Sequence, residues 1–231
     1  MNKRNYLATI VYDARGADGS SDEMIPKLIK GGFYHSGQVC VSVQRIFVIN
    51  GDARLLAEKL AAEATKLTVG NAIKETTECG PLIRPREVDR VESWVNAALI
   101  SGAQALCGGK RLSKTTYDPT VLLNPDASQN VSTSEIFGPV ICIYDCKSNQ
   151  EAIEKANSLE FAFQSAVFSN ELKESLYFFH NLDSSAVMIN DHTAFRVDWM
   201  PFAGRRQSGY GVGGIGYTME DMSQIKMAVI S

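Results

Sequence analysis

The chain has no long apolar run and no excess of basic charge. Its 231 residues include 23 lysines and arginines against 26 aspartates and glutamates, which gives a formal net charge of −3. Nucleic-acid binding favours a basic surface, so this balance gives it little support. No stretch reaches the roughly 18 consecutive apolar residues that a membrane-spanning helix needs. We therefore expect neither a nucleic-acid partner nor a membrane partner.

The cysteines lack the pattern of a disulfide framework or a zinc site. There are five of them, an odd number, and no two form a CxxC pair. We therefore expect no metal site and a reducing compartment, which places the protein in the cytoplasm. Residues 1–5 lead into only a short apolar stretch, unlike a secretory signal. Cys142 and Cys146 lie four apart in a strand-like run and are interpreted as small core residues.

Strands and helices alternate along the whole chain. Several of the expected strands are apolar on both faces, which predicts an α/β fold with a mainly parallel sheet covered by helices. The expected strands are 7–12, 44–50, 140–144, 165–169 and 186–190. The expected helices are 22–33, 52–67, 86–103, 149–159 and 171–181. Residues 15–21, 69–84 and 193–216 are interpreted as loops, and 106–125 as short strands and turns.

Two helices carry apolar stripes that predict their buried faces. In the helix over 86–103 the stripe is formed by valines and alanines such as Val91 and Val95. In the helix over 171–181 we expect Leu172, Leu176 and Phe179 to face inward. The chain is interpreted as one domain over 1–216, followed by a tail over 217–231 that contains a terminal strand at 224–230.

Cys40 is the residue that most clearly suggests chemistry. It lies between an expected helix end and a strand, where its thiol would be partly exposed beside free backbone N–H groups. Such groups favour a thiolate and can bind an oxyanion. Taken alone, the same spacing also fits a buried core cysteine.

Two further segments are distinctive, although each also has an ordinary structural interpretation. The segment 134–140, SEIFGPV, puts a carboxylate and an aromatic ring just before a buried strand, and it also fits a tight turn. The segment 200–211, MPFAGRRQSGYG, also fits a surface loop whose glycines adopt special backbone dihedrals.

Four segments together resemble the aldehyde dehydrogenase superfamily, specifically its C-terminal catalytic portion. FYHSGQVC (33–40) resembles the family's cysteine motif, and CGPLI (79–83) matches its GPLI turn. SEIFGPV resembles its E-x-F-G-P signature, and MPFAGRRQSGYG its PFGG-x-K-x-SG-x-G segment. Their order and spacing agree with the family over nearly the whole chain.

The resemblance implies a reaction and roles for particular residues. An NAD(P)-dependent aldehyde dehydrogenase oxidises a small-molecule aldehyde to a carboxylate through a thiohemiacetal and a thioester on its cysteine. Cys40 would be this nucleophile, and its backbone N–H would bind the oxyanion. Glu135 would hold the nicotinamide ribose of NAD or NADP, and Phe137 would pack beside the nicotinamide.

Residues 190–199 should line the aldehyde entrance by the same resemblance. The substrate-binding residues are then Asn190, His192 and Arg196. His192 and Arg196 could bind an anionic or hydroxylated aldehyde, such as lactaldehyde, a semialdehyde or phosphonoacetaldehyde. Arg45 is another candidate for that task. Alternatively, Arg196 pairs with Asp198 or another neighbour at the surface.

Family members are about twice as long as this chain. Their N-terminal half carries the glycine-containing cofactor turn, an oxyanion-hole Asn and the general-base Glu. We therefore expect the cofactor-binding domain to be absent here and the isolated chain to be inactive. The resemblance also implies that the terminal strand crosses to a neighbouring subunit, giving a homodimer or a higher homo-oligomer. Two alternatives stay open: a CoA-acylating aldehyde dehydrogenase, and a non-catalytic fragment acting only in assembly.

Overall fold

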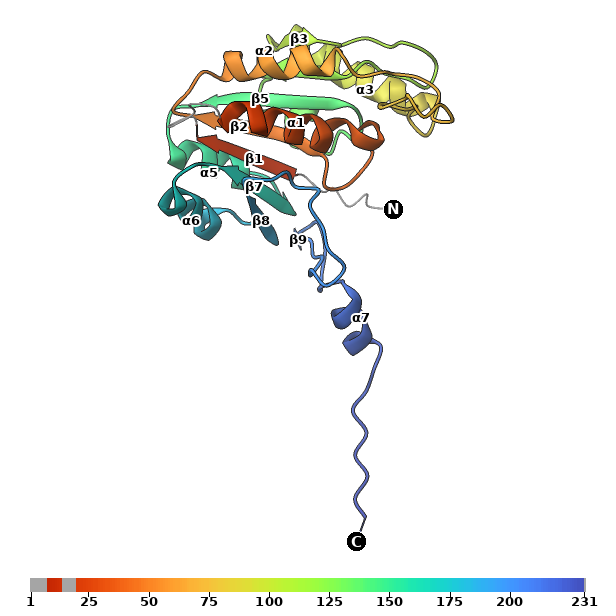
Figure 1. Ribbon diagram of the computed structural model, residues 1–231, viewed down its shortest axis with the longest axis vertical. Coiled ribbons are helices and arrows are strands. Elements are labelled where there is room, and N and C mark those ends of the chain that lie inside the picture. Colours follow the sequence, from red (N-terminus) through yellow and green to blue (C-terminus); the bar gives the residue numbers. More distant parts are fainter. Residues whose placement is uncertain (1–7, 14–19, 231) are drawn as a thin grey trace.

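A computed structural model describes residues 8–13 and 20–230 of the chain (Figure 1). The start of the first predicted strand at Leu7 lies outside the described residues, as do residues 1–5 and most of the predicted loop over 15–21. Within the described part, a single large sheet carries helices on both faces.

The large sheet has seven strands in the order β3-β4-β5-β2-β1-β7-β8. All neighbouring pairs are parallel except β3 and β4, which are antiparallel. The predicted α/β fold with a mainly parallel sheet is thus confirmed. The strands are β1 (Ala8–Asp13), β2 (Val43–Ile49), β3 (Gln104–Cys107), β4 (Thr120–Leu123), β5 (Val140–Cys146), β7 (Gln164–Phe168) and β8 (Ala186–Ile189). A separate two-stranded sheet pairs β6 (Phe161–Ala162) with β9 (Arg205–Arg206).

The longer helices divide between the two faces of the sheet. On one face lie α1 (Ser20–Phe33) and α2 (Ala53–Ala64), and on the other lie α3 (Pro85–Ile100), α5 (Asn149–Asn157) and α6 (Leu172–Asn181). Shorter elements are η1 (Tyr34–Gly37), α4 (Asn130–Thr133) and α7 (Ile215–Asp221). The side chain of Asp52 caps α2 by accepting from the backbone N–H groups of Arg54 and Leu55, which fixes where that helix begins.

Each face of the sheet contributes to its own apolar core. Leu28 of α1 and Leu60 of α2 pack in one core, while Val91 of α3 packs in the other. The stripe predicted on α3 is confirmed, because its valines are fully buried. Cys142 and Cys146 are also buried in the second core, as predicted for small core residues.

The prediction of which face of α6 is buried is wrong. Leu172 is 68% exposed and Phe179 is 50% exposed, whereas Ser175 and Phe178 are buried. The helix carries apolar residues on two adjacent stripes, so apolar spacing alone does not choose between them. Packing on the sheet selects the stripe with the small Ser175, which lets the helix approach closely.

The predicted terminal strand finds no partner among the described residues of this one chain, and its pairing with a neighbouring subunit stays a prediction. After α7, residues 223–230 run as an extended segment that pairs with no strand among the described residues (Figure 1). An extended segment becomes a strand only when a neighbouring backbone takes its hydrogen bonds. Ile225, Met227 and Val229 are all more than 80% exposed. No helix in the described part of the chain is long and apolar enough to cross a membrane.

Candidate active site

The cysteine loop and the EIFGP segment meet at one edge of the sheet. Cys40 lies just before β2, and residues 135–139 lie just before β5. Because β2 and β5 are neighbouring parallel strands, the segments that precede them emerge at the same edge. Gly37, which has a φ of 69°, packs directly against the carbonyl of Gly138. The fold therefore brings together two motifs that lie about a hundred residues apart.

The cysteine loop contains an uncommon run of left-handed backbone. His35, Ser36 and Gly37 have φ values of 50°, 57° and 69°, and only the last is a glycine. Left-handed residues other than glycine cost about 1–2 kcal/mol each, so other contacts must hold them. The buried Ser36 provides one, since its Oγ donates to the carbonyl of Gly80 at 2.6 Å. It also accepts from the thiol of Cys79 at 3.5 Å.

Gln38 joins the cysteine loop to the turn over 79–83. Its Nε2 donates to the carbonyl of Pro81 at 3.2 Å, and its Oε1 accepts from the backbone N–H of Ile83 at 2.8 Å. The side-chain amide thus binds both a donor and an acceptor of the same turn. Sequence reasoning treated 69–84 as a loop and missed this support for the residue two positions before Cys40.

Gln44 fixes the segment that carries Glu135 and Phe137. It is 5% exposed, its Nε2 donates to the carbonyl of Ser134 at 2.8 Å, and its Oε1 accepts from the N–H of Ile136 at 2.9 Å. Glu135 is half-buried beneath this network. Phe137 adopts a φ of 49°, and its ring is 41% exposed. Nothing in the sequence singled out Gln44, because its partners lie about ninety residues away.

Cys40 lies in a mixed electrostatic environment. Burial raises the pKa of its thiol, and the charge of Glu135 raises it further. The backbone N–H groups of Cys40 and Val41, together with Arg196, act in the opposite direction and lower this pKa. The predicted N–H groups are therefore present, but burial outweighs them. The structure brings three predicted site residues together: Cys40, Glu135 and Arg196.

The segment after β8 runs alongside α1 towards Cys40. Lys27 Nζ donates to the carbonyl of Asn190 at 2.7 Å, and the His192 side chain packs against Gly31. The buried Thr193 then donates its Oγ1 hydrogen to the carbonyl of Val41 at 2.7 Å. His192 and Thr193 consequently lie at the cysteine loop.

Asn190 lies at the opposite end of that segment. Its side-chain Oδ1 accepts from the N–H of Ser169, and its Nδ2 donates to the Ser169 carbonyl, both at 3.0 Å. The amide thus joins the ends of β7 and β8. The structure therefore does not bring this predicted substrate residue to Cys40.

The two arginines considered for substrate binding occupy different environments. Arg196 is exposed and stacks on Phe202, with its guanidinium carbon 4.8 Å from the ring centroid. It donates to the carbonyl of Met200 at 3.3 Å, a contact different from the Asp198 pairing that the sequence left open. Arg45 is buried and donates to Thr9 Oγ1 at 2.8 Å, and burial lowers its pKa to about 10. Arg45 therefore ties β2 to β1 instead of facing a substrate.

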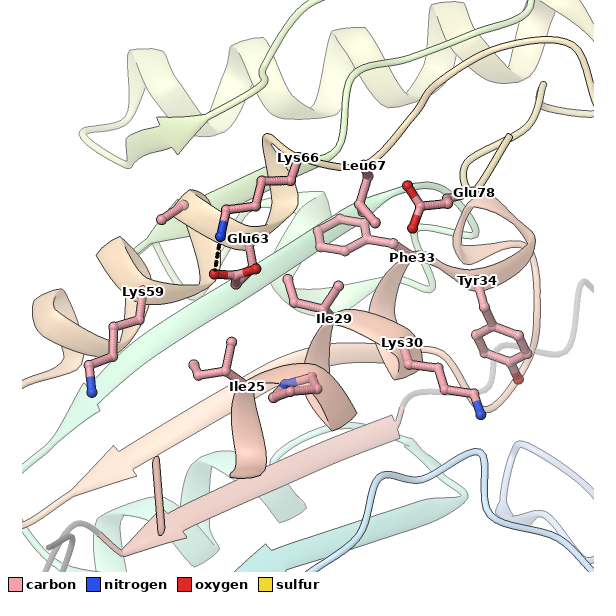
Figure 2. Close-up of a pocket in the computed structure, with 12 residues that line it drawn as sticks. Ile25, Ile29, Lys30, Phe33, Tyr34, Lys59, Glu63, Lys66, Leu67 and Glu78 are labelled. Atoms are coloured by element: carbon pink, nitrogen blue, oxygen red, sulfur yellow. Dashed lines mark hydrogen bonds and ion pairs between the residues drawn. The ribbon is translucent and has the colours of Figure 1, made fainter. Parts of the chain in front are cut away.

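Two of the hollows beside α1 differ in size and lining. The larger, of about 770 Å³, lies between α1 and α2, and Figure 2 shows apolar side chains such as Ile29 and Phe33 lining it. The smaller, of about 440 Å³, lies between α1 and residues 191–195. Its lining residues are Pro26, Lys27, Lys30, Tyr34, Asp191, His192, Ala194 and Phe195. Among the described residues, no group of three or more His, Cys, Asp or Glu side chains could hold a metal ion.

A mainly parallel α/β domain that places Cys40 near Glu135 and Arg196 is the arrangement that the resemblance to aldehyde dehydrogenases predicts. The sequence model of the Aldehyde dehydrogenase family matches residues 8–228, so the chain belongs to this family.

Similar proteins cover the chain almost completely. It is 41% identical over 214 residues to a lactaldehyde dehydrogenase of Methanocaldococcus jannaschii, covering 93% of this chain and 46% of that protein. It is 35% identical over 227 residues to a 3-sulfolactaldehyde dehydrogenase of Priestia aryabhattai, covering 98% and 46%. Glyceraldehyde-3-phosphate dehydrogenase GapN of M. jannaschii, solved with NADP, superimposes with a TM-score of 0.88 at 39% identity, covering 98% and 48%. The chain thus spans about half the length of its relatives.

Proposed function

We propose that the chain is the C-terminal, thiol-bearing portion of an NAD(P)-dependent aldehyde dehydrogenase, with Cys40 as its nucleophile. The observation that carries this proposal is the position of the Cys40 thiol at the sheet edge. There it is influenced by Glu135 and Arg196 and lies beside the backbone N–H groups of Cys40 and Val41.

In the proposed reaction the Cys40 thiolate attacks the aldehyde carbonyl, forming a C–S bond and an oxyanion. The backbone N–H of Cys40 donates a hydrogen bond to this oxyanion. Glu135 and Phe137 would hold a bound NAD or NADP, which would supply the acceptor for the hydride that leaves the adduct on Cys40. The thioester left on Cys40 is hydrolysed by water, which releases a carboxylate and regenerates the thiolate.

Two residues fit the nicotinamide end of the cofactor. Glu135 offers a half-buried carboxylate, which can accept hydrogen bonds from the paired ribose hydroxyls. Phe137 offers an exposed ring against which the flat nicotinamide can pack. The remaining cofactor contacts belong to the portion of the protein that this chain does not match, so we expect the isolated chain not to turn over aldehyde.

The substrate is proposed to be a small polar aldehyde. Two of the similar proteins are named for lactaldehyde and 3-sulfolactaldehyde, whose chains carry a hydroxyl or a sulfonate. Arg196 and His192, next to the cysteine loop, can bind such groups through charge and hydrogen bonds. The Asn190 amide is occupied by Ser169, so we give it the role of holding this segment in place.

The proposal is tested by acylation of the isolated chain with 4-nitrophenyl acetate, which needs no cofactor. We expect one equivalent of nitrophenol per chain, with the acetyl group found on Cys40 by peptide mass spectrometry. Cys40→Ser should abolish this release. Cys107→Ser should leave it unchanged, because burial raises the pKa of the Cys107 thiol to about 11. Acylation spread evenly over several cysteines would contradict the assignment of Cys40.

The lifetime of the acetyl group on Cys40 tests whether water or coenzyme A is the acyl acceptor. In a hydrolytic dehydrogenase the resemblance places the general base outside the portion that this chain matches. The acetyl group on Cys40 of this chain should then persist in water, with or without added coenzyme A. Rapid transfer to added coenzyme A would instead favour the CoA-acylating alternative. An adduct that never forms would favour a fragment acting only in assembly.

We also propose that the protein is a cytoplasmic homodimer or a higher homo-oligomer. Its cysteines are free thiols, which suits a reducing compartment. In the tail, Ile225, Met227 and Val229 alternate along an exposed extended segment, as expected of a strand that adds to a sheet edge. Light scattering should give at least a dimer mass, and Ile225→Glu with Val229→Glu should reduce it. A monomer mass for the unaltered chain would exclude this assembly.

A further inference from the structure

The smaller hollow beside α1 is lined by two lysines and one carboxylate, and we name it the lysine groove. Lys27, Lys30 and Tyr34 contribute to its wall from α1 and the turn that follows. Their spacings of three and four residues place them on one side of the helix. The opposite wall is the segment 191–195, which includes Asp191 and His192.

The lysine groove lies beside the cysteine loop. One of its walls is pinned to the cysteine loop, because Thr193 donates to the carbonyl of Val41 at 2.7 Å. The other wall reaches the thiol through Tyr34, whose pKa is raised by burial and by the charge of Cys40. In Figure 2 the ends of Lys30 and Tyr34 point away from the apolar side chains of the larger hollow.

The groups that line the lysine groove sum to a positive charge. Asp191 is the carboxylate in its lining, and its Oδ1 accepts from the backbone N–H of His192 at 2.8 Å. Lys27 is held by the carbonyl of Asn190, while the Lys30 side chain is exposed. Two ammonium groups therefore face one carboxylate.

His192 adds a hydrogen-bond donor to this wall. Its Nδ1 accepts from the backbone N–H of Ala194 at 3.1 Å, so in the neutral ring the proton lies on Nε2. Burial lowers the pKa of His192, Asp191 opposes this by raising it, and Lys30 and Lys27 lower it, so that the pKa lies below its usual value and the neutral ring is favoured. A neutral donor beside two ammonium groups suits an oxyanion.

We propose that the lysine groove is the subsite for the anionic end of the substrate, with Lys30 as its principal charge. This proposal rests on the proposed function, because the groove has this meaning only if Cys40 is the nucleophile. The ligand class is a short aldehyde that ends in a sulfonate, carboxylate or phosphate. Lys30 attracts the anion electrostatically, and Nε2–H of His192 donates to one of its oxygens.

The test compares two alkylating reagents of nearly equal size on the full chain. Iodoacetate carries a carboxylate, whereas iodoacetamide is neutral, and both transfer their two-carbon group to a thiolate with loss of iodide. The rate of Cys40 modification is measured with each reagent by peptide mass spectrometry. A positive groove raises the ratio of the iodoacetate rate to the iodoacetamide rate. We expect Lys30→Gln to lower this ratio about threefold, the size expected for one charge across solvated protein.

Matched variants separate the groove from the overall charge. Lys59 lies on α2 and does not line the lysine groove, so Lys59→Gln makes the same change of net charge outside the groove. It should leave the ratio unchanged, and Lys30→Arg should retain the ratio of the unaltered chain. Circular dichroism verifies that each variant is folded.

The outcomes distinguish the two proposals. An unchanged ratio in Lys30→Gln, with Cys40 still modified by iodoacetamide, would overturn the subsite and leave the nucleophile assignment standing. An equal fall in Lys59→Gln would also overturn it, because the effect would then come from net charge. If iodoacetamide does not modify Cys40 in the unaltered chain, both the proposed function and the subsite are rejected.

Discussion

The Cα of Gly37 faces the carbonyl oxygen of Gly138 so closely that a Cβ at position 37 would lie 2.1 Å from that oxygen. This contact joins the loop that carries Cys40 to the segment that carries Glu135. No side chain fits between the two backbones without moving one of them.

Gly37→Ala should therefore destabilise the fold and separate Cys40 from Glu135. The left-handed φ alone costs a non-glycine residue about 1–2 kcal/mol, and the clash with Gly138 adds to it. Gly211 is the matched control, because its φ of 75° is similar and nothing lies within 4 Å of a Cβ there. Urea unfolding should show a larger loss for Gly37→Ala than for Gly211→Ala. Equal losses would mean that backbone strain, and not the contact, accounts for the effect.

The pH dependence of Cys40 alkylation should respond in opposite directions to its two charged neighbours. The carboxylate of Glu135 raises the pKa of the thiol, so Glu135→Gln should move the alkylation profile to lower pH and speed alkylation near neutrality. Arg196 lowers the same pKa, so Arg196→Gln should move the profile to higher pH. The alkylation rate is followed with iodoacetamide, a neutral reagent. Shifts of the same sign in both variants would contradict this electrostatic account.

Gln38 should be a positioning residue for the cysteine loop. Gln38→Met keeps the length of the side chain but removes its bonds to Pro81 and Ile83, and we expect a loss of about 1–3 kcal/mol in unfolding free energy. Gln207→Met is the control, since Gln207 is exposed and its amide donates to Glu160. A positioning role further requires Gln38→Met to change the pH profile of Cys40, and an unchanged profile would leave only a role in stability.

The Thr193 hydroxyl should be needed to hold its segment against the cysteine loop. Thr193→Val is nearly isosteric and removes the bond to the Val41 carbonyl, so we expect a loss of about 1–3 kcal/mol in thermal or urea unfolding. Thr193→Ser retains the hydroxyl and should preserve most of the stability. If the serine variant were as unstable as the valine variant, the lost methyl contacts and not the hydrogen bond would explain the change.

The sequence predicted the order of the longer strands and helices, but it missed short elements such as β6 and β9 and failed where a side chain had a choice of partners. The valines of α3 form one clear stripe, so their burial could be predicted. The helix α6 has apolar residues on two stripes, and only contact with the sheet decides that Phe178 is buried and Leu172 is not. The residues around Ile225 have the alternating pattern of a strand, but the segment pairs with no strand among the described residues. Pairing requires a second backbone, which local sequence does not specify.

The candidate site likewise contains residues that the sequence predicted and residues that it did not. Motif order singled out Cys40 and Glu135, and the structure places Glu135 close enough for its charge to raise the pKa of the Cys40 thiol. The residues that hold them, such as Gln44 and Thr193, are ordinary polar residues within their local sequence. Their roles come from hydrogen bonds to distant backbone groups, which local spacing does not reveal. Lys30 likewise lines a groove only because the segment 191–195 lies alongside α1.

The hydrogen bond between Thr193 and Val41 spans 152 residues of sequence, which has a consequence for the order of events during folding. Closing so long a loop costs chain entropy that local turns do not, so such contacts form late. During synthesis Thr193 emerges 152 residues after Val41, so this contact cannot form while Cys40 is first leaving the ribosome. The reactive surroundings of the thiol are thus completed near the end of folding, and alkylation of Cys40 can serve as a clock for that final step.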